Sequence, residues 1–290
     1  MRLAVLGYPL AHTLSPVMHN AALAALGLLG WHYAAWPVPA ELLAEAVAQL
    51  RGADWAGANV TVPYKEAVLP HLDALTPTAA GIGAANTLFK QDGRLLGHNT
   101  DAAGLLADLY ALEVDLTGRP ALILGAGGAA RAAVAACAAV GAEARVAARR
   151  PEQVEALRAV GPLQAFALDE AGVRMAAADC AVIVNCTPLG LRPADPSPWP
   201  EAVPWPPGAF AYDLIYNPAE TRFTRQARHA GLRAATGLGM LVEQGALALE
   251  LWTGQTAPRA LMRAAAERAL QSPPASSSPA AEQAGGESRG

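Results

Sequence analysis

A short apolar run, a glycine-rich turn and an alanine-rich helical segment follow one another in LILGAGGAAR at residues 122–131. Gly125, Gly127 and Ala130 keep the spacing G-x-G-x-x-[G/A], with a strand-like segment before it and a helix-like segment after it. Glycines let the backbone approach a pyrophosphate, and the helix start offers free N–H groups and a positive dipole end. A glycine turn alone occurs in many α/β proteins, but these flanking segments favour a nucleotide site. The residues predicted to form it are Gly125, Gly127, Gly128, Ala129 and Ala130.

Strand-like and helix-like segments alternate along most of the chain, which indicates parallel sheets built from βαβ units and hence an α/β fold. Asp92-Gly93 predicts a hairpin turn. The stretch 188–208 holds eight prolines and predicts an irregular surface loop. Strands are predicted at residues 1–6, 31–36, 56–62, 87–89, 94–97, 121–124, 144–148, 181–184, 209–214 and 233–235. Helices are predicted at residues 15–26, 40–50, 102–111, 129–140, 243–252 and 264–270.

Composition narrows the class of protein. The 290 residues are 53% hydrophobic and 16% charged, with a formal net charge of −4 and no basic stripe, which argues against nucleic acid as a partner. We find no apolar run long enough for a membrane span and no signal peptide, so we expect a cytoplasmic protein. The cysteines lack metal-ligand spacing, so we expect reduced thiols in a core and no metal.

Two arginines follow the strand that ends at Ala148. An NAD site favours an acidic residue at this position, where it binds the ribose 2′-hydroxyl. Arg149 and Arg150 instead offer guanidinium groups that suit a 2′-phosphate. They are also compatible with an ordinary solvated loop. We favour NADP over NAD.

Polar residues also stand in the first half of the chain where a core would not need them. Thr13 and Ser15 bring two hydroxyls to the start of a helix, which favours an anion such as a carboxylate. Ser15 is equally suited to be the N-cap of that helix, and one residue can serve both purposes.

Three further polar segments are predicted near strand ends, where ligands of α/β proteins bind. Asn59 and Thr61 alternate along one strand and Lys65 follows it, while Asn86 and the segment Asn99-Thr100-Asp101 lie farther on. Lys65 alone would be a solvated lysine and Asp101 alone a helix cap. Together these segments suggest a pocket for a small polyhydroxylated acid.

Several segments, in order, resemble the shikimate dehydrogenase family. They cover residues 1–270 and are GYPLAHTLSP, NVTVPYKE, GAANTL, GHNTDAAG, GAGGAAR, NCTPLG, YDLIYNP and GLGMLVEQGALALELWTG. The resemblance implies NADPH-dependent reversible reduction of 3-dehydroshikimate to shikimate, a step towards chorismate and the aromatic amino acids. For the oligomeric state, a monomer and a homodimer both stay open.

The resemblance further implies two domains and a set of site residues. Residues 1–101 with 237–270 would bind substrate on a mostly parallel α/β fold completed by C-terminal helices. Residues 102–236 would form a Rossmann-like NADP domain, and 271–290 a disordered tail. Lys65 and Asp101 would be the catalytic pair. Substrate would be bound by Thr13, Ser15, Thr61, Asn86, Tyr216 and Gln244. Asn185, Thr187, Gly237 and Met240 would flank the nicotinamide, in addition to the glycine turn and Arg149 and Arg150.

The chain departs from the family pattern at a few positions. Thr13 stands where serine is usual, and its methyl group narrows the carboxylate end of the predicted site. Ala148-Arg149-Arg150 replaces the usual Asn-Arg-Thr, and Leu191 replaces methionine. These changes put substrate selectivity, not the type of reaction, in doubt. Two alternative functions stay open. One is a quinate/shikimate dehydrogenase with broader substrate or cofactor use, and the other is a non-catalytic sensor of nucleotide or metabolite.

Overall fold

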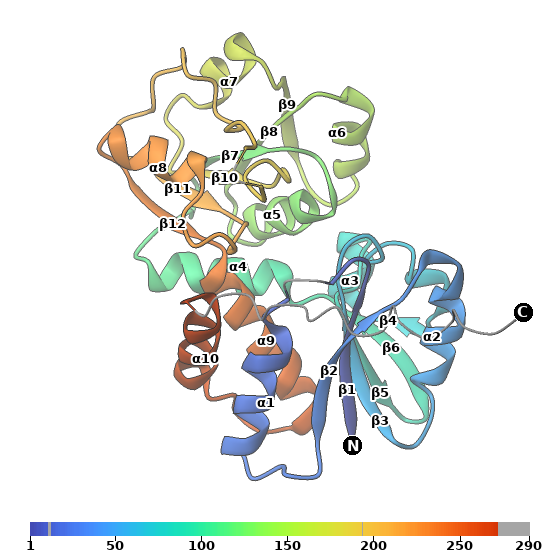
Figure 1. Ribbon diagram of the computed structural model, residues 1–290. Helices are drawn as coiled ribbons and strands as arrows, with labels where there is room; N and C mark the ends of the chain where they lie inside the picture. Colours follow the sequence, from blue (N-terminus) through green and yellow to red (C-terminus); the bar gives the residue numbers. More distant parts are fainter. Residues whose placement is uncertain (11–12, 193, 272–290) are drawn as a thin grey trace, which may run out of the picture.

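The computed structural model describes residues 1–10, 13–192 and 194–271, which form two lobes, each built on a six-stranded sheet (Figure 1). The first sheet has the order β2-β1-β3-β5-β6-β4. Its strands are β1 (Arg2–Gly7), β2 (His32–Pro37), β3 (Trp55–Val60), β4 (Ala74–Leu75), β5 (Thr87–Gln91) and β6 (Arg94–His98).

The first sheet is mixed, and its register sets where the polar segments lie. Strands β1, β2 and β3 pair in parallel, whereas β5 pairs antiparallel with both β3 and β6. The β5–β6 turn is the predicted Asp92-Gly93 hairpin, with φ of 51° and 76°. Because β5 runs opposite to β3 and β6, its start at Thr87 lies beside Asn59 and His98. The segments that follow β3 and β6 therefore meet the start of β5 at one edge.

The second sheet is wholly parallel, as expected for buried strands covered by helices on both faces. Its order, β12-β11-β10-β7-β8-β9, is that of a Rossmann-type sheet with the switch point between β7 and β10. The strands are β7 (Pro120–Leu124), β8 (Glu143–Ala148), β9 (Leu163–Ala167), β10 (Val182–Asn185), β11 (Phe210–Asp213) and β12 (Arg233–Thr236), and the helices are α5 (Gly128–Ala139), α6 (Pro151–Leu157), α7 (Glu170–Ala176) and α8 (Arg222–His229).

Helices from distant parts of the sequence join the lobes. Helix α4 (Asp101–Ala111) leaves the first sheet and lies between the lobes, where it packs against α9 (Leu238–Thr253) and α5 (Figure 1). Helix α10 (Arg259–Gln271) packs against α1 (Ser15–Ala25), so the C-terminal helices complete the first lobe. The predicted α/β fold class, with returning C-terminal helices, is confirmed. The smaller helices are α2 (Leu43–Gln49) and α3 (Pro77–Ile82).

Some local expectations differ from the structure. Ser15 is the first residue of α1 and Leu14 the N-cap, without a side-chain cap, so the predicted cap is wrong. The proline-rich stretch 188–208 has no helix or strand among its described residues, but it is only partly a surface loop. Trp199 is 1% exposed and stacks on Trp205, with ring centroids 4.1 Å apart. Both rings pack with buried residues of β7, β10 and β11, so the stretch covers one face of the second sheet.

The predicted limits of the two domains stay a prediction. The structure places Gln271, expected to open the tail, at the end of α10, and residues 272–290 lie outside the described residues. Within the described ranges no helix is long and apolar enough to cross a membrane. The three cysteines are buried, and this burial raises the pKa of the Cys137 thiol to about 12 and that of Cys180 to about 11.

His19 is a fully buried side chain on α1 with no partner for either ring nitrogen. Its ring stacks on Tyr33 with centroids 4.2 Å apart and an interplanar angle of 7°. Burial penalises the charged imidazolium and lowers the pKa of His19 from 6.5 to about 3. Between these two pH values the unfolded chain takes up a proton that the folded chain does not.

We therefore expect His19 to make the protein less stable as the pH falls from 6.5 towards 3. Its contribution to the loss is about 1.4 kcal/mol for each pH unit. His19→Phe keeps the ring stack and removes the titration, so its unfolding free energy should fall less between pH 7 and pH 5, where the linkage acts below pH 6.5. Urea unfolding at both pH values measures this, with the exposed His32→Gln as control. An equal loss in His19→Phe and the unsubstituted protein would contradict the assignment.

Candidate active site

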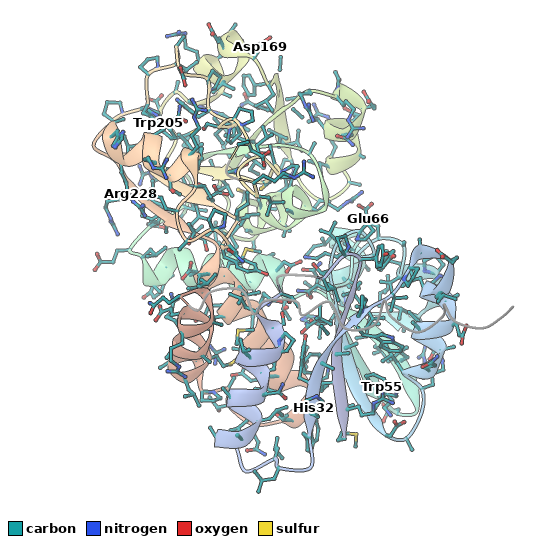
Figure 2. The ribbon with its side chains drawn as sticks, in the orientation of Figure 1. His32, Trp55, Glu66, Asp169, Trp205 and Arg228 are labelled. Atoms are coloured by element: carbon teal, nitrogen blue, oxygen red, sulfur yellow. The ribbon has the colours of Figure 1, made fainter. Side chains whose placement is uncertain are left out.

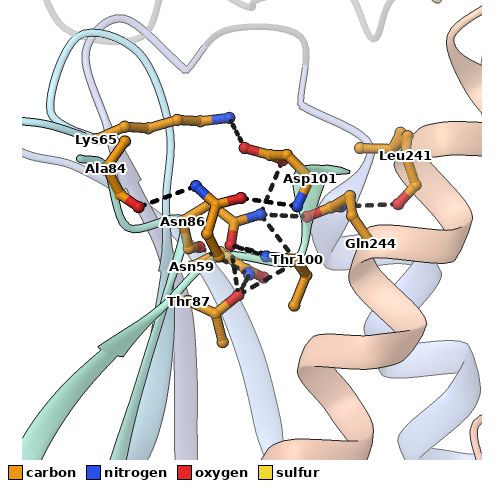
Figure 3. A network of polar contacts seen from close by, with 10 residues as sticks. Asn59, Lys65, Ala84, Asn86, Thr87, Thr100, Asp101, Leu241 and Gln244 are labelled. Carbon is orange, nitrogen blue, oxygen red and sulfur yellow. Dashed lines mark hydrogen bonds and ion pairs between the residues drawn. The ribbon is translucent and has the colours of Figure 1, made fainter. Parts of the chain in front are cut away.

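Lys65 follows β3 and Asp101 follows β6 at the same end of the first sheet. Their side chains form an ion pair with 2.6 Å between Nζ and Oδ2 (Figure 3). Lys65 stands in the turn after β3, and its carbonyl accepts a hydrogen bond from the Ala85 amide at 2.8 Å. Asp101 is the first residue of α4, where a carboxylate also complements the helix dipole. The Asp101 side chain is 6% exposed and that of Lys65 is 20% exposed, so the ammonium is the accessible end of the pair.

Asn86 holds the other oxygen of the Asp101 carboxylate. Its Nδ2 lies 2.8 Å from Asp101 Oδ1 and 2.9 Å from Thr100 Oγ1, while its Oδ1 accepts from the Thr100 amide at 2.8 Å. The Asn99 side chain accepts from the Asp101 amide at 3.0 Å. Asn86 is 2% exposed. The orientation of Asp101 is thus fixed from both sides before any ligand binds.

Gln244 reaches this network from α9. Its Oε1 lies 3.2 Å from Asn86 Nδ2, and its Nε2 donates to the Leu241 carbonyl at 2.7 Å. The approach depends on Gly104 in α4, where an added Cβ would lie 2.8 Å from the backbone nitrogen of Gln244. A side chain at Gly104 would therefore push α9, and Gln244 with it, away from Asn86.

A second polar cluster gathers around the start of α1. Thr13 Oγ1 accepts from the Ser15 amide and lies 3.3 Å from the Ser15 hydroxyl. Tyr216, from the loop after β11, lies close to the Thr13 hydroxyl and the Leu14 amide, and burial raises the pKa of its phenol. Burial likewise raises the pKa of Tyr33, whose hydroxyl is near Ser15. The predicted substrate residues Thr13, Ser15 and Tyr216 therefore lie together, although Tyr216 comes from the other lobe.

Asn59 connects the two clusters. The Tyr33 hydroxyl donates to Asn59 Oδ1 at 2.7 Å, and Asn59 Nδ2 donates to the Asn86 carbonyl at 3.1 Å. Asn59 is 6% exposed. Thr61, two residues farther, packs its methyl group against Gly7, where an added Cβ would lie 2.4 Å from it. The first lobe thus holds one continuous polar network with Lys65 at its accessible end.

The glycine turn lies at the switch point of the second sheet. Gly125 has φ of 103°, and an added Cβ would lie 3.0 Å from the Thr187 methyl group. The N-cap residue of α5 is Gly127, so no side chain caps the start of this helix. A Cβ added at Gly127 or Gly128 would meet no other atom within 4 Å. A helix start without a side-chain cap suits a pyrophosphate, because its first amides are unsatisfied donors at the positive end of the helix. Arg149 and Arg150 are exposed just after β8.

Asn185 and Thr187 shape the loop that follows β10. Asn185 is fully buried, and its Oδ1 accepts from the Thr187 amide at 2.9 Å and the Thr187 hydroxyl at 2.7 Å. Its Nδ2 donates to Asp213 Oδ1 at 2.9 Å. Burial raises the pKa of Asp213 to about 6. The Asn185 side chain thus holds the loop in place, so Asn185 would support a bound group indirectly, through the shape of the loop.

Gly237 and Met240 link the start of α9 to the second sheet. A Cβ at Gly237 would lie 2.3 Å from the Leu214 carbonyl oxygen, so only glycine fits this contact. The Met240 amide donates to the Tyr212 hydroxyl at 3.3 Å. Their predicted place beside the nicotinamide stays a prediction.

Reasoning from the sequence left some residues of these networks without a role. Tyr33 stands inside an apolar strand, and its hydroxyl gave no signal. Asp213 lies within YDLIYNP, where a carboxylate in an apolar strand was the available clue. Asp108 of α4 was also missed, although it accepts from the Tyr212 hydroxyl at 2.6 Å and pairs with Arg263 at 3.2 Å.

A separate hollow of about 570 Å³ lies on the second lobe between Gly190 and α8 and contains none of the predicted site residues. Two of the arginines that line it are engaged, since Arg222 pairs with Glu201 and Arg225 with Glu220. Among the described residues no group of three or more His, Cys, Asp or Glu side chains is arranged to hold a metal ion.

Comparison with known proteins identifies the family. Residues 5–88 match the shikimate dehydrogenase substrate binding domain, and residues 237–267 match the shikimate 5′-dehydrogenase C-terminal domain. The shikimate dehydrogenase (NADP(+)) of Symbiobacterium thermophilum is 43% identical over 281 residues, covering 94% of this chain and 95% of that protein. A counterpart from Thermus thermophilus is 46% identical over 270 residues, covering 93% and 99%. The chain belongs to the shikimate dehydrogenase family. The predicted family and enzyme class are confirmed.

Solved structures of similar proteins share the fold. Shikimate 5-dehydrogenase from Thermus thermophilus, in complex with NADP(H) and shikimate, is 45% identical with a TM-score of 0.84, and 93% of this chain and 99% of that chain are covered. The ligand-free 5-ketofructose reductase of a Gluconobacter strain is 32% identical with a TM-score of 0.81, with 92% and 98% covered. The same two-lobed fold therefore occurs in proteins named for different substrates.

Removal of the Asn86 amide should weaken the fold as well as the site. Asn86→Ala leaves Asp101 Oδ1 and the Thr100 amide without their partner, and a buried group left unsatisfied costs about 1–3 kcal/mol. We expect a loss of that size in unfolding free energy by urea denaturation. Gln49→Ala removes an exposed amide on α2 and should change stability by less than about 0.5 kcal/mol. Equal stability of the two variants would show that the network is not formed.

Proposed function

We propose that this protein catalyses the reversible NADPH-dependent reduction of 3-dehydroshikimate to shikimate, with Lys65 and Asp101 as its catalytic pair. The observation that carries the proposal is the 2.6 Å ion pair at the polar edge of the first sheet, in a chain of the shikimate dehydrogenase family. The step belongs to the route to chorismate and the aromatic amino acids. We propose a cytoplasmic enzyme that acts as a monomer or a homodimer.

Lys65 is the proposed proton donor. Bound NADPH supplies a hydride to the C3 carbonyl, and the carbonyl oxygen gains negative charge. The Lys65 ammonium stabilises that oxygen and transfers a proton to it, and in the reverse direction it accepts the proton. Asp101 holds Nζ by a charge-assisted hydrogen bond, and Asn86 holds Asp101. The fixed carboxylate therefore orients the donor, which reduces the reorganisation needed during the reaction.

Each polar cluster is proposed to contact a different part of the substrate, one the carboxylate and the other the ring hydroxyls. Thr13 and Ser15 lie at the start of α1, where hydroxyl groups and the helix end favour the substrate carboxylate. Tyr216, beside Thr13, extends that end from the second lobe. Asn86 and Gln244, which lie 3.2 Å apart, are the proposed partners of the ring hydroxyls, together with Thr61 just after β3.

The second lobe holds NADP at the switch point of its sheet. The glycine turn at residues 125 and 127–130 is the proposed pyrophosphate site, at the start of α5, where no side chain caps the helix. Arg149 and Arg150 are the proposed partners of the 2′-phosphate. The proposed nicotinamide end of the cofactor site consists of Asn185, Thr187, Gly237 and Met240.

A broader substrate range is the second candidate function. Thr13 brings a methyl group to the carboxylate cluster, and a 32% identical relative is named a 5-ketofructose reductase. Initial rates followed by absorbance of the reduced nicotinamide, with shikimate or quinate and NADP or NAD, distinguish the two. Turnover with shikimate and NADP alone supports the first proposal, and comparable rates with quinate support the second. Ligand-induced thermal stabilisation without turnover would indicate a sensor.

Replacement of Lys65 should slow chemistry without weakening binding. Lys65→Ala removes the proton donor, and a positioned acid contributes ~10²–10⁴-fold, so we expect kcat to fall by at least about a hundredfold. The KM for shikimate should change little. Lys90→Ala is the matched control, because Lys90 donates to the Gly52 carbonyl, away from this network. Near-normal turnover of Lys65→Ala would remove Lys65 from the reaction.

The two arginines after β8 should decide the choice of cofactor. In Arg149→Ala/Arg150→Ala the 2′-phosphate loses charge-assisted hydrogen bonds, so the KM for NADP should rise by roughly tenfold or more. The KM for NAD should stay the same, since NAD lacks that phosphate. Steady-state kinetics with both cofactors measure this, and Arg174→Ala on α7 is the control. A parallel rise in both KM values would contradict 2′-phosphate recognition.

A further inference from the structure

Arg131 connects the nucleotide-binding helix to the lobe that carries Lys65. It lies in the first turn of α5, and its side chain is 16% exposed. Its Nη2 lies 2.8 Å from Glu66 Oε2, and its Nη1 donates to the Ile82 carbonyl at 3.2 Å. Both partners belong to the first lobe. Figure 2 shows Glu66 at the edge of that lobe that faces the second lobe.

Arg131 contacts two segments of the first lobe that meet at the hydrogen bond between the Ala85 amide and the Lys65 carbonyl. Glu66 follows Lys65 directly, within a turn closed by hydrogen bonds from the Tyr64 amide to Thr61 and from the Val68 amide to Tyr64, both at 2.9 Å. The chain after Ile82 passes through Gly83 to Ala85, whose amide binds the Lys65 carbonyl. One guanidinium therefore holds both sides of this contact.

The local fit around the guanidinium is close. Gly83 ends α3 with φ of 68°, and an added Cβ would lie 3.2 Å from Arg131 Nη1. Glu66 is 52% exposed, and ion pairs with one exposed partner add little to stability. The contact therefore matters through geometry, because small displacements of a catalytic group lower the rate strongly.

We propose that Arg131 is a positioning residue that couples occupation of the nucleotide site at α5 to the placement of the Lys65 ammonium. The proposal rests on the proposed function, since it takes Lys65 as the proton donor and NADP as the ligand of α5. Binding of a nucleotide orders the first turn of α5. Arg131 transmits that order through Glu66 and Ile82 to the turn that carries Lys65.

The first test is a double-mutant cycle with Arg131→Gln, Glu66→Gln and both together. We expect each single variant to lower kcat by about tenfold to a hundredfold. The double variant should be no slower than the slower single variant, because both changes break one interaction. The KM for NADP should stay near normal in all three. Arg158→Gln is the matched control, since Arg158 also contacts one carboxylate, Glu155, and one carbonyl, Leu163, but within its own lobe.

The outcomes separate positioning from the other roles of an arginine. A large rise in the KM for NADP in Arg131→Gln alone would mean direct contact with the cofactor and would overturn the proposal. Additive losses of kcat would overturn it too, as would a lower melting temperature with unchanged kcat. Recovery of kcat in the charge swap Arg131→Glu/Glu66→Arg would support it.

Hydrogen exchange supplies a readout that does not need turnover. NADPH alone should slow amide exchange in the peptide that contains residues 61–68 of the original protein and of Arg158→Gln, but not of Arg131→Gln or Glu66→Gln. Equal protection in all four proteins, or none in residues 61–68 of the original protein, would overturn the coupling. If protection follows this pattern while shikimate is not oxidised, the coupling stands and the proposed function fails.

Discussion

The shared carboxylate of Asp101 is the interaction on which the site depends. One oxygen accepts from Lys65 and the other from Asn86, while the backbone amide of Asp101 is held by Asn99. A nearly buried carboxylate is stable only when its lone pairs have donors, and here each donor comes from a different segment. Strand β3, the β5–β6 hairpin and helix α4 must therefore all be in place before the ammonium has a fixed position. The mixed register of the first sheet achieves this, because reversal of β5 brings its start to the edge where β3 and β6 end.

Helix α4 carries this constraint into the second lobe. It begins at Asp101 and, two turns later, presents Asp108 to the Tyr212 hydroxyl of β11 and to Arg263 of α10. Gly239 permits the approach, since a Cβ there would overlap the Asp108 carboxylate. The helix that positions the Asp101 carboxylate is thus fixed at its far end to the second sheet and to the C-terminal helices. Figure 1 shows α4 between the two lobes, consistent with a shared structural element.

Much of the fold and the site follows from local sequence. The strand, glycine turn and helix around Gly125, and the Asp92-Gly93 hairpin, are encoded by neighbouring residues and appear as predicted. The order of motifs also indicates that Lys65 and Asp101 belong to one site. Helices α3, α6, α7 and α8 and strands β4 and β9 were missed. Helices α6 and α8 are short and charged, and three of the five residues of β9 are exposed. The link from Arg131 to Glu66 was not predictable, since it depends on how two lobes meet and neither residue has an unusual local pattern.

Aromatic packing inside the first lobe, among His19, Tyr33 and Trp252, explains how an apolar core supports a polar site. Tyr33 is fully buried between the unpartnered ring of His19, on which it stacks, and Trp252, 6.1 Å away. This packing fixes the Tyr33 ring, and the fixed ring directs its hydroxyl to Asn59, which in turn binds the Asn86 carbonyl. A neutral His19 suits this position, because a charged ring would have to remain without water or a counter-ion. The stack therefore links the packing of α1 and α9 to the orientation of Asn86, and through Asn86 to the carboxylate that holds Lys65.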